Sequence, residues 1–383
     1  MRIIAAPDSF KGSLSSAAAA QAIEHGVHAV FPEAEVIKVP IADGGEGTVD
    51  ALISGGRGQL MQTTVENPLG QPVQAKWGLL KNADSYTAVI EMAEASGLLL
   101  IPEDKRDIRR AGTYGTGQLI RAALDQGARR IIIGIGGSAT NDGGAGMAQA
   151  LGAGLLDSEG HALAHGGAAL ALLDRIELQD LDPRLKETEI LIASDVNNPL
   201  CGPKGASAVY GPQKGASPEI VQELDAALFH YNTIARRDIG IDANGIAGSG
   251  AAGGLGAGLM LFTNGRMCNG IQLILETIAF EKLLTDVSLV ITGEGHTDAQ
   301  TAHGKAPVGI ARLAKKQQIP VLCLSGALGS DADEVLTQGI DAIAATPCSP
   351  ISLEKCISQA EALLTQAAAR SMQLIKIGLQ MKN

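Results

Sequence analysis

The chain has 383 residues, of which 45% are hydrophobic and 19% charged, and this composition excludes an intrinsically disordered or fibrous protein. The formal net charge of −11 and the lack of a long basic run argue against a nucleic acid as partner. Five scattered cysteines without a CxxC pair are typical of reduced thiols. Because the chain reaches Asp8 too early for a signal-peptide core and its apolar runs do not suit a bilayer, we expect a cytoplasmic protein without membrane contact.

Two short strands are predicted near the N-terminus, over Arg2–Pro7 and Val36–Pro40, with a helix between them. A polar loop follows each strand, and the two loops contain Ser9, Lys11, Asp43 and Glu46. Because ligands bind at the carboxyl ends of strands in open α/β sheets, we expect these side chains to converge on a site. A solvated surface lysine at Lys11 and a turn-capping role for Asp43 remain alternatives.

The spacing of the apolar residues changes over residues 59–92. Every second residue from 73 to 79 is apolar, namely Val73, Ala75, Trp77 and Leu79, and this alternation predicts antiparallel strands. We therefore expect a domain boundary near Ser54–Gly58.

A glycine-rich turn follows the apolar strand predicted over Ile131–Ile135. The turn contains Gly136, Gly137, Ser138, Ala139, Thr140, Asn141 and Asp142. Glycines let the backbone approach a ligand closely, and a helix expected from about Gly144 would point its N-terminus at the same place. These features favour a phosphate group as ligand, although a turn that serves only tight packing fits the pattern equally well.

The same turn also matches the dinucleotide fingerprint through Gly134, Gly136 and Ala139. An NAD-dependent oxidoreductase is therefore an alternative function. A second glycine-rich segment, Gly248–Gly258, follows no clear strand, so phosphate contact and close helix packing both explain it.

Asp195 follows another buried strand, predicted over Ile190–Ser194. An aspartate at the end of a buried strand can hold a metal ion, act as a base or cap the loop, and the sequence leaves all three roles open.

Three more strands are predicted towards the C-terminus, over Val287–Thr292, Pro320–Ser325 and Asp341–Ala345. Together with the two N-terminal strands they make an ordinary doubly wound parallel sheet, whereas neither group suffices alone. We therefore predict a discontinuous α/β domain over residues 1–58 and 285–383, with a mixed α/β domain with glycine-rich phosphate loops, residues 59–284, inserted in it.

The assembled motifs resemble those of the bacterial type 1 glycerate kinase family. The matching segments are Ala6–Ser13, Ala42–Thr48, Gly136–Gly144, Asp195–Leu200, Gly211–Ala216 and Gly293–Gly295, with Asp298, Gln300 and Thr301. They cover nearly the full chain in order. One departure is His296, which stands where the family pattern leads us to expect arginine.

The resemblance implies ATP-dependent phosphorylation of D-glycerate, with 2-phosphoglycerate as the product in many members, in glyoxylate or sugar-acid catabolism. It also implies a flavodoxin-like domain beside a second α/β domain, with ATP and Mg²⁺ as cofactors. It leaves open which hydroxyl group accepts the phosphate and whether the chain forms homo-oligomers.

Phosphoryl transfer needs donors around the phosphates, a divalent cation and a base near the attacking hydroxyl. On this basis we assign roles to residues in the matching motifs and in the second glycine-rich segment. Nucleotide binding is assigned to Gly136, Gly137, Ser138, Thr140, Asn141, Gly253 and Gly254. Catalysis is assigned to Asp195 as base and Lys11 as the neutralising cation, substrate binding to Ser9, Asp43, Glu46, Lys214 and Asp298, and Mg²⁺ to Asp142 or Asp43. The base and metal roles are exchangeable at this point.

Overall fold

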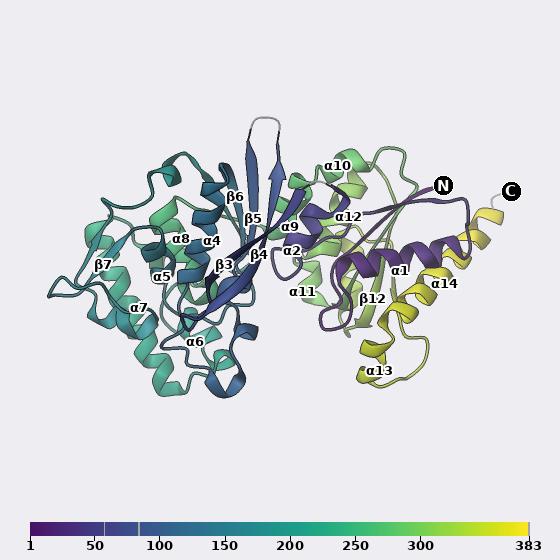
Figure 1. Ribbon diagram of the computed structural model, residues 1–383. Helices are drawn as coiled ribbons and strands as arrows, with labels where there is room; N and C mark the ends of the chain where they lie inside the picture. Colours follow the sequence, from purple (N-terminus) through teal and green to yellow (C-terminus); the bar gives the residue numbers. More distant parts are fainter. Residues whose placement is uncertain (57, 83–84, 382–383) are drawn as a thin grey trace. The chain divides into compact units, whose positions relative to one another are not determined.

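The computed structural model describes residues 1–56, 58–82 and 85–381 (Figure 1). The chain divides into two compact units. The first unit consists of Met1–Asp43, Asp50–Ser54 and Ile271–Asn383, and the second of Gly44–Val49 and Gly55–Gly270. Residues 271–284, which the sequence analysis assigned to the inserted domain, thus belong to the first unit.

The first unit is built on a five-stranded sheet in which every neighbouring pair is parallel. Its strand order is β13-β12-β11-β1-β2. The strands are β1 (Arg2–Pro7), β2 (Glu35–Lys38), β11 (Leu289–Thr297), β12 (Val321–Leu328) and β13 (Ala342–Ala345). These are the five segments that the sequence combined into one sheet. The apolar residues of β1, β11 and β12 are buried, whereas the edge strands β2 and β13 are partly exposed.

Helices cover this sheet, and α1 and α14 pack against each other (Figure 1). Ser15 caps the start of α1 by accepting a hydrogen bond from the Ala18 amide, as the serines before this helix predict. The helices of this unit are α1 (Ser16–His28), α9 (Gly270–Thr277), α10 (Phe280–Leu283), α11 (Ala299–Ala302), α12 (Ala306–Lys316), α13 (Leu353–Ser358) and α14 (Ala360–Gln380), whereas α2 (Thr48–Ile53) contributes residues to both units.

The second unit contains a six-stranded mixed sheet with the order β10-β9-β6-β5-β4-β3. The pairs β3·β4 and β4·β5 are antiparallel, as the alternating sequence predicts, and the remaining pairs are parallel. The strands are β3 (Gly58–Glu66), β4 (Pro72–Lys81), β5 (Tyr86–Glu91), β6 (Ala128–Gly134), β9 (Glu189–Ala193) and β10 (Arg266–Cys268). A separate antiparallel pair is formed by β7 (Gly154–Leu156) and β8 (Arg175–Glu177).

The helices of the second unit surround a core to which Trp77, Ile131 and Ile133 contribute. They are α3 (Ala93–Ser96), α4 (Tyr114–Asp125), α5 (Ala145–Ala150), α6 (Ala206–Tyr210), α7 (Pro218–Asp238) and α8 (Leu255–Thr263). Across the described part of the chain, no helix combines the length and the apolar character needed to span a bilayer.

Two elements differ from the sequence prediction. Strand β11 continues to Thr297 instead of ending at Thr292, because Glu294 and His296 still pair with β12. The sequence of Ile271–Leu284 predicts one helix, but the structure interrupts it at Ala279, whose φ of 52° is left-handed. Helix α5 begins at Ala145, close to the expected start at about Gly144, and has six residues. The spacing of apolar residues therefore shows where a helix or strand lies better than it shows the first and last residues of that element.

Candidate functional site

The glycine turn of the second unit begins where β6 ends. Gly136 and Gly137 are exposed, and among the residues that the structure describes their N–H groups find no hydrogen-bond acceptor. Gly137 has a φ of +73°, a conformation that favours glycine. Backbone amides that face solvent from such a turn are well suited to bind an anion.

Ser138 and Thr140 lie next to these amides but are buried. The Ser138 hydroxyl oxygen accepts a hydrogen bond from the Thr140 amide at 3.1 Å and can donate to the Ala252 carbonyl at 3.3 Å. The two side chains therefore hold the shape of the turn.

Lys214 is buried against the same turn. Its ammonium group donates to the Thr140 carbonyl at 2.7 Å and to the Ser138 hydroxyl at 3.2 Å. Burial lowers the pKa of Lys214 to about 7, and the charge of Asp142 opposes this shift. The sequence assigned Lys214 to the substrate, and the structure brings it to the glycine turn.

The second glycine-rich segment packs directly on the first. Gly253 has a φ of +68°, and a Cβ atom on this residue would lie 1.9 Å from the Thr140 carbonyl oxygen. The Gly253 carbonyl accepts a hydrogen bond from the Gly143 amide at 3.1 Å, and a Cβ on Gly254 would lie 2.8 Å from the Gly143 Cα. Close packing of two loops thus accounts for both glycines.

Gly253→Ala is therefore expected to lower the melting temperature by several degrees and to raise the KM for the ligand of the turn, because the added methyl group must displace the Thr140 carbonyl. Gly240→Ala is the matched control, since Gly240 also has a positive φ, +85°, but open space around its Cα. That control should cost only about 1 kcal/mol of stability. Equal melting temperatures for the two variants would contradict the packing argument.

Asp142 is buried inside the turn and uses both of its carboxylate oxygens. One oxygen accepts from the Thr113 amide and hydroxyl, each at 2.8 Å, and from the Gly146 amide at 3.2 Å, while the other accepts from the Gly144 amide at 3.2 Å. The Asp142 carboxylate thus occupies the N-terminus of α5, where the sequence analysis expected a phosphate group to bind. Burial raises the pKa of Asp142, and these hydrogen bonds oppose the shift.

Asn141 faces the interior of the same unit. Its amide group donates to the Ser207 hydroxyl at 2.9 Å, and its buried side-chain oxygen finds no partner among the described residues. By contrast, Asp195 is exposed after β9 and accepts hydrogen bonds from the Asn269 side chain at 2.6 Å and the Gly270 amide at 3.2 Å.

The first unit contains a cavity of about 480 Å³ at the carboxyl ends of its strands. Ser9, Lys11 and Asp43, which the sequence expected to converge, line this cavity together. Its other polar and charged lining residues are Asp8, Ser13, Glu294, His296, Lys305 and Thr346. Glu46 is exposed and belongs to the second unit, so it does not share this cavity.

Asp8 is a buried carboxyl that the sequence analysis did not single out. Burial raises its pKa to about 7, with further contributions from the negative charges of Asp43 and Glu294. Its position in the sequence could have indicated a site residue, since Asp8 is the first polar residue after β1. A carboxyl that titrates near neutrality in a cavity is suited to acid–base chemistry.

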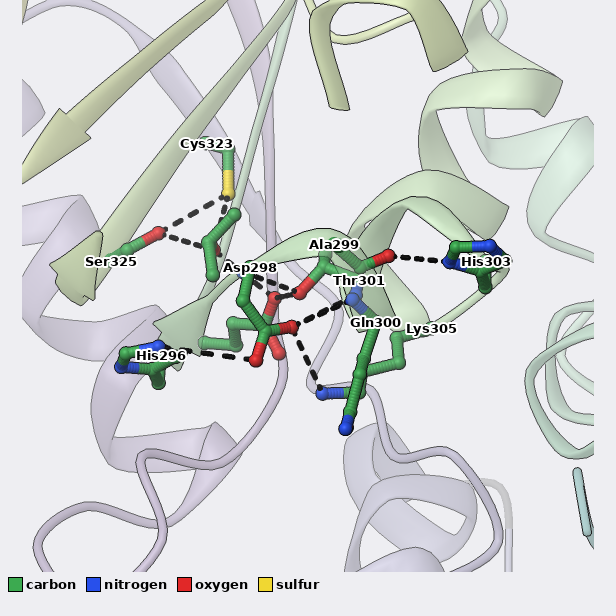
Figure 2. A network of polar contacts seen from close by, with 11 residues as sticks. His296, Asp298, Ala299, Gln300, Thr301, His303, Lys305, Cys323 and Ser325 are labelled. Atoms are coloured by element: carbon green, nitrogen blue, oxygen red, sulfur yellow. Dashed lines mark hydrogen bonds and ion pairs between the residues drawn. The ribbon is translucent and has the colours of Figure 1, made fainter. Parts of the chain in front are cut away.

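Glu294 reaches the cavity from β11 and is tied to a buried polar network around Thr297 and Thr301, part of which Figure 2 shows. Asp298 caps α11 and lies 3.9 Å from the side-chain nitrogens of both His296 and Lys305 (Figure 2). Asp298 therefore sits beside the cavity lining without being part of it.

Comparisons with known proteins agree with the sequence resemblance. The model of the glycerate kinase family matches residues 3–376. The chain is 48% identical to the glycerate kinase of Bacillus subtilis (strain 168), over 98% of this chain and 99% of that protein. It is 46% identical to the glycerate 2-kinase of Escherichia coli (strain K12), over 99% of each chain.

A solved structure from Salmonella typhimurium LT2, assigned to glycerate kinase 2, matches with a TM-score of 0.89 and 45% identity, over 99% of each chain. These findings overturn the oxidoreductase alternative based on Gly134, Gly136 and Ala139. The geometry of the turn also argues against a dinucleotide there, because the Asp142 carboxylate already occupies the N-terminus of the short helix α5.

Proposed function

The chain belongs to the glycerate kinase family, and we propose that it transfers the γ-phosphoryl group of ATP to a hydroxyl group of D-glycerate. The observation that carries the proposal is the buried Lys214 ammonium group beside the exposed amides of Gly136 and Gly137. A cation and backbone donors at one turn are the groups that phosphoryl transfer requires around the phosphates.

For the nucleotide, we propose that Gly136, Gly137 and Ser138 contact the phosphates and that Lys214 neutralises their charge. Thr140, Asn141, Gly253 and Gly254, which the sequence also assigned to the nucleotide, act by holding the turn in shape. Their burial and their contacts within the turn support this division.

For glycerate, we propose the cavity of the first unit. Lys11 and Ser9 would bind the carboxylate, because an anion in an acidic cavity needs a local cation. Asp43 lines the same cavity and stays a predicted substrate ligand. Asp298 and Glu46 lie outside the cavity lining, so we propose an indirect role for Asp298, through its ion pair with Lys305, and leave Glu46 as a sequence prediction.

The base that removes the proton of the accepting hydroxyl group is assigned to Asp8. Its burial in the cavity and its pKa of about 7 support this role. Asp195, the choice made from the sequence, stays the rival, although it is exposed and already accepts hydrogen bonds from Asn269 and Gly270.

Mg²⁺ has no matching ligand set within the described residues, where no group of three or more His, Cys, Asp or Glu side chains is arranged to hold a metal ion. Asp142 does not fit, because hydrogen bonds occupy both of its oxygens. Asp43 remains a Mg²⁺ ligand predicted from sequence. Mg²⁺ in kinases is held largely by the substrate phosphates, and we derive no step through a protein-bound ion.

We further infer that the first unit is a doubly wound, flavodoxin-like domain. The order β2-β1-β11-β12-β13 supports this, since it is the flavodoxin order 2-1-3-4-5 when the strands are numbered along the unit. The name of the Escherichia coli relative supports 2-phosphoglycerate as product. A cytoplasmic location, a role in glyoxylate metabolism and the oligomeric state stay predictions from sequence.

The test is to incubate the purified chain with ATP, Mg²⁺ and D-glycerate and to follow ADP release, with ³¹P NMR to identify the product. We expect ADP release that depends on D-glycerate and a phosphate ester on one hydroxyl group. ATP binding without turnover, or turnover that does not depend on D-glycerate, would refute the proposal.

A further inference from the structure

Glu294 presents a carboxyl group to the cavity of the first unit from within a buried network. Only 7% of this residue is exposed. One oxygen, Oε1, accepts hydrogen bonds from the Thr301 hydroxyl at 2.6 Å and from the Thr297 hydroxyl at 3.1 Å. Among the described residues no donor reaches the second oxygen, Oε2, so one side of the carboxyl group is fixed and the other is available.

The two threonines are themselves held in place. The Thr297 hydroxyl lies 2.7 Å from the Ser325 hydroxyl on β12, and Thr301 forms a capping box with Asp298 at the start of α11 (Figure 2). Thr297, Thr301 and Ser325 are fully buried. The rotamer of Glu294 is therefore set by residues of two strands and a helix, as a precise binding group requires.

The charge of the cavity favours an acid that also carries hydroxyl groups. Lys11 and Lys305 line it together with Asp8 and Glu294. Cations can bind a carboxylate, whereas a fixed carboxylate oxygen accepts a hydrogen bond from a hydroxyl group. Burial also raises the pKa of Glu294, which the threonine hydrogen bonds and Lys305 oppose.

We propose that Glu294 holds, through Oε2, the hydroxyl group of glycerate that is not phosphorylated, and thereby selects acids with two hydroxyl groups over acids with one. This assignment rests on the proposed function. A buried acceptor that is left unpaired penalises an analogue without the hydroxyl group far more than an added contact could reward it.

The test compares glycerate with two analogues that each lack one hydroxyl group, lactate and 3-hydroxypropanoate. The KM for D-glycerate and the inhibition constant of each analogue against it are measured for the wild type and for Glu294→Gln. We expect the KM for glycerate to rise about 10- to 100-fold, because Thr297 and Thr301 hold the single amide oxygen of Gln and its NH₂ group, which cannot accept a hydrogen bond, takes the place of Oε2. The inhibition constant of the analogue that lacks the held hydroxyl should change less than about threefold, and that of the other should rise with KM.

Positioning is tested at Thr301. Thr301→Val removes the donor at 2.6 Å and should raise the KM for glycerate, whereas Thr301→Ser keeps the hydroxyl group and should restore it. Glu361→Gln, the same chemical change at an exposed position of α14, is the matched control and should leave all constants unchanged. The KM for ATP should stay constant in every variant.

An unchanged KM for glycerate in Glu294→Gln, or a parallel rise of KM and both inhibition constants, would overturn the proposal. Circular dichroism of each variant identifies a loss of fold. If Glu294→Gln does not fold, Thr301→Val supplies the test, because it leaves Glu294 in place but removes the hydrogen bond that orients it, and an unchanged KM for glycerate in this variant would overturn the proposal. Failure of the proposed function is a different result, since the wild type would then show no glycerate-dependent turnover at all.

Discussion

Asp8→Asn is expected to lower kcat for glycerate phosphorylation by about 10²- to 10⁴-fold while the KM for ATP changes less than about threefold. An amide cannot take the proton of the accepting hydroxyl group, but it keeps the size of the side chain and can still accept the hydrogen bond from the Ser9 amide. In the wild type, kcat/KM should rise with pH up to the pKa of Asp8, about 7, and this limb should vanish in the variant.

The same substitution is expected to stabilise the fold at alkaline pH. The pKa of Asp8 is about 7 in the folded chain and has an ordinary value of 3.8, so the folded state binds the proton more tightly than the unfolded state. Between these values, rising pH ionises Asp8 in the unfolded chain first, and the free energy of unfolding falls. Above pH 7 the full cost is on the order of 4 kcal/mol, and Asn avoids it.

Thermal unfolding at pH 4 and pH 8.5 checks this sign. Asp8→Asn should melt several degrees above the wild type at pH 8.5, and the difference should shrink towards pH 4. Asp195→Asn is the comparison for catalysis, since the sequence favoured that residue as base. If Asp195→Asn abolishes turnover while Asp8→Asn leaves kcat intact, the base is Asp195 and the assignment made here is wrong.

The sheet of the first unit could be predicted from sequence because most of its strands are short apolar runs bounded by polar loops, whereas β10 of the second unit, with three residues, was not predicted. Ile3, Ile291 and Leu324 lie in three distant segments, yet each stands in such a run, and all three contribute to one core. Parallel pairing then follows from the alternation of strands and helices. The ends of helices and strands could be predicted less well from sequence. The extension of β11, for example, depends on pairing with β12, which the local spacing of apolar residues does not encode.

The sequence predicted which residues gather at the candidate site and missed the properties that depend on burial. Lys11 lines one cavity together with Ser9 and Asp43, as the polar loops after two strands predict. The pKa of Asp8 is raised by burial first and then by the negative charges of Asp43 and Glu294, which are far from it in the sequence. Similarly, no local pattern tells that the Lys214 amine is buried against Thr140. Such effects arise from tertiary packing and become visible only when the fold is known.

Lys214→Met is expected to raise the KM for ATP about 10- to 100-fold, because the turn loses a cation and two hydrogen bonds to Ser138 and Thr140. Lys204→Met, a change at an exposed lysine of the same unit, should leave the KM for ATP unchanged. An equal KM for ATP in both variants would contradict the assignment of Lys214 to the phosphates.

Proton uptake gives an independent measurement of the same interaction. With a pKa of about 7, the Lys214 amine is mostly neutral at pH 8, and the negative phosphates should raise this pKa on binding. We therefore expect ATP binding at pH 8 to take up close to one proton. Titration calorimetry in two buffers of different ionisation enthalpy measures this uptake, which should disappear in Lys214→Met.

The effect on stability has the opposite pH dependence to that of Asp8. The folded pKa of Lys214 lies below its ordinary value of 10.5, so the folded state disfavours the charged amine. The cost is complete below pH 7 and fades as pH rises towards 10. Relative to the wild type, Lys214→Met should therefore be more stable at pH 6 than at pH 9.5. A difference in melting temperature that does not change with pH would mean that the amine stays charged throughout, paired with Asp142.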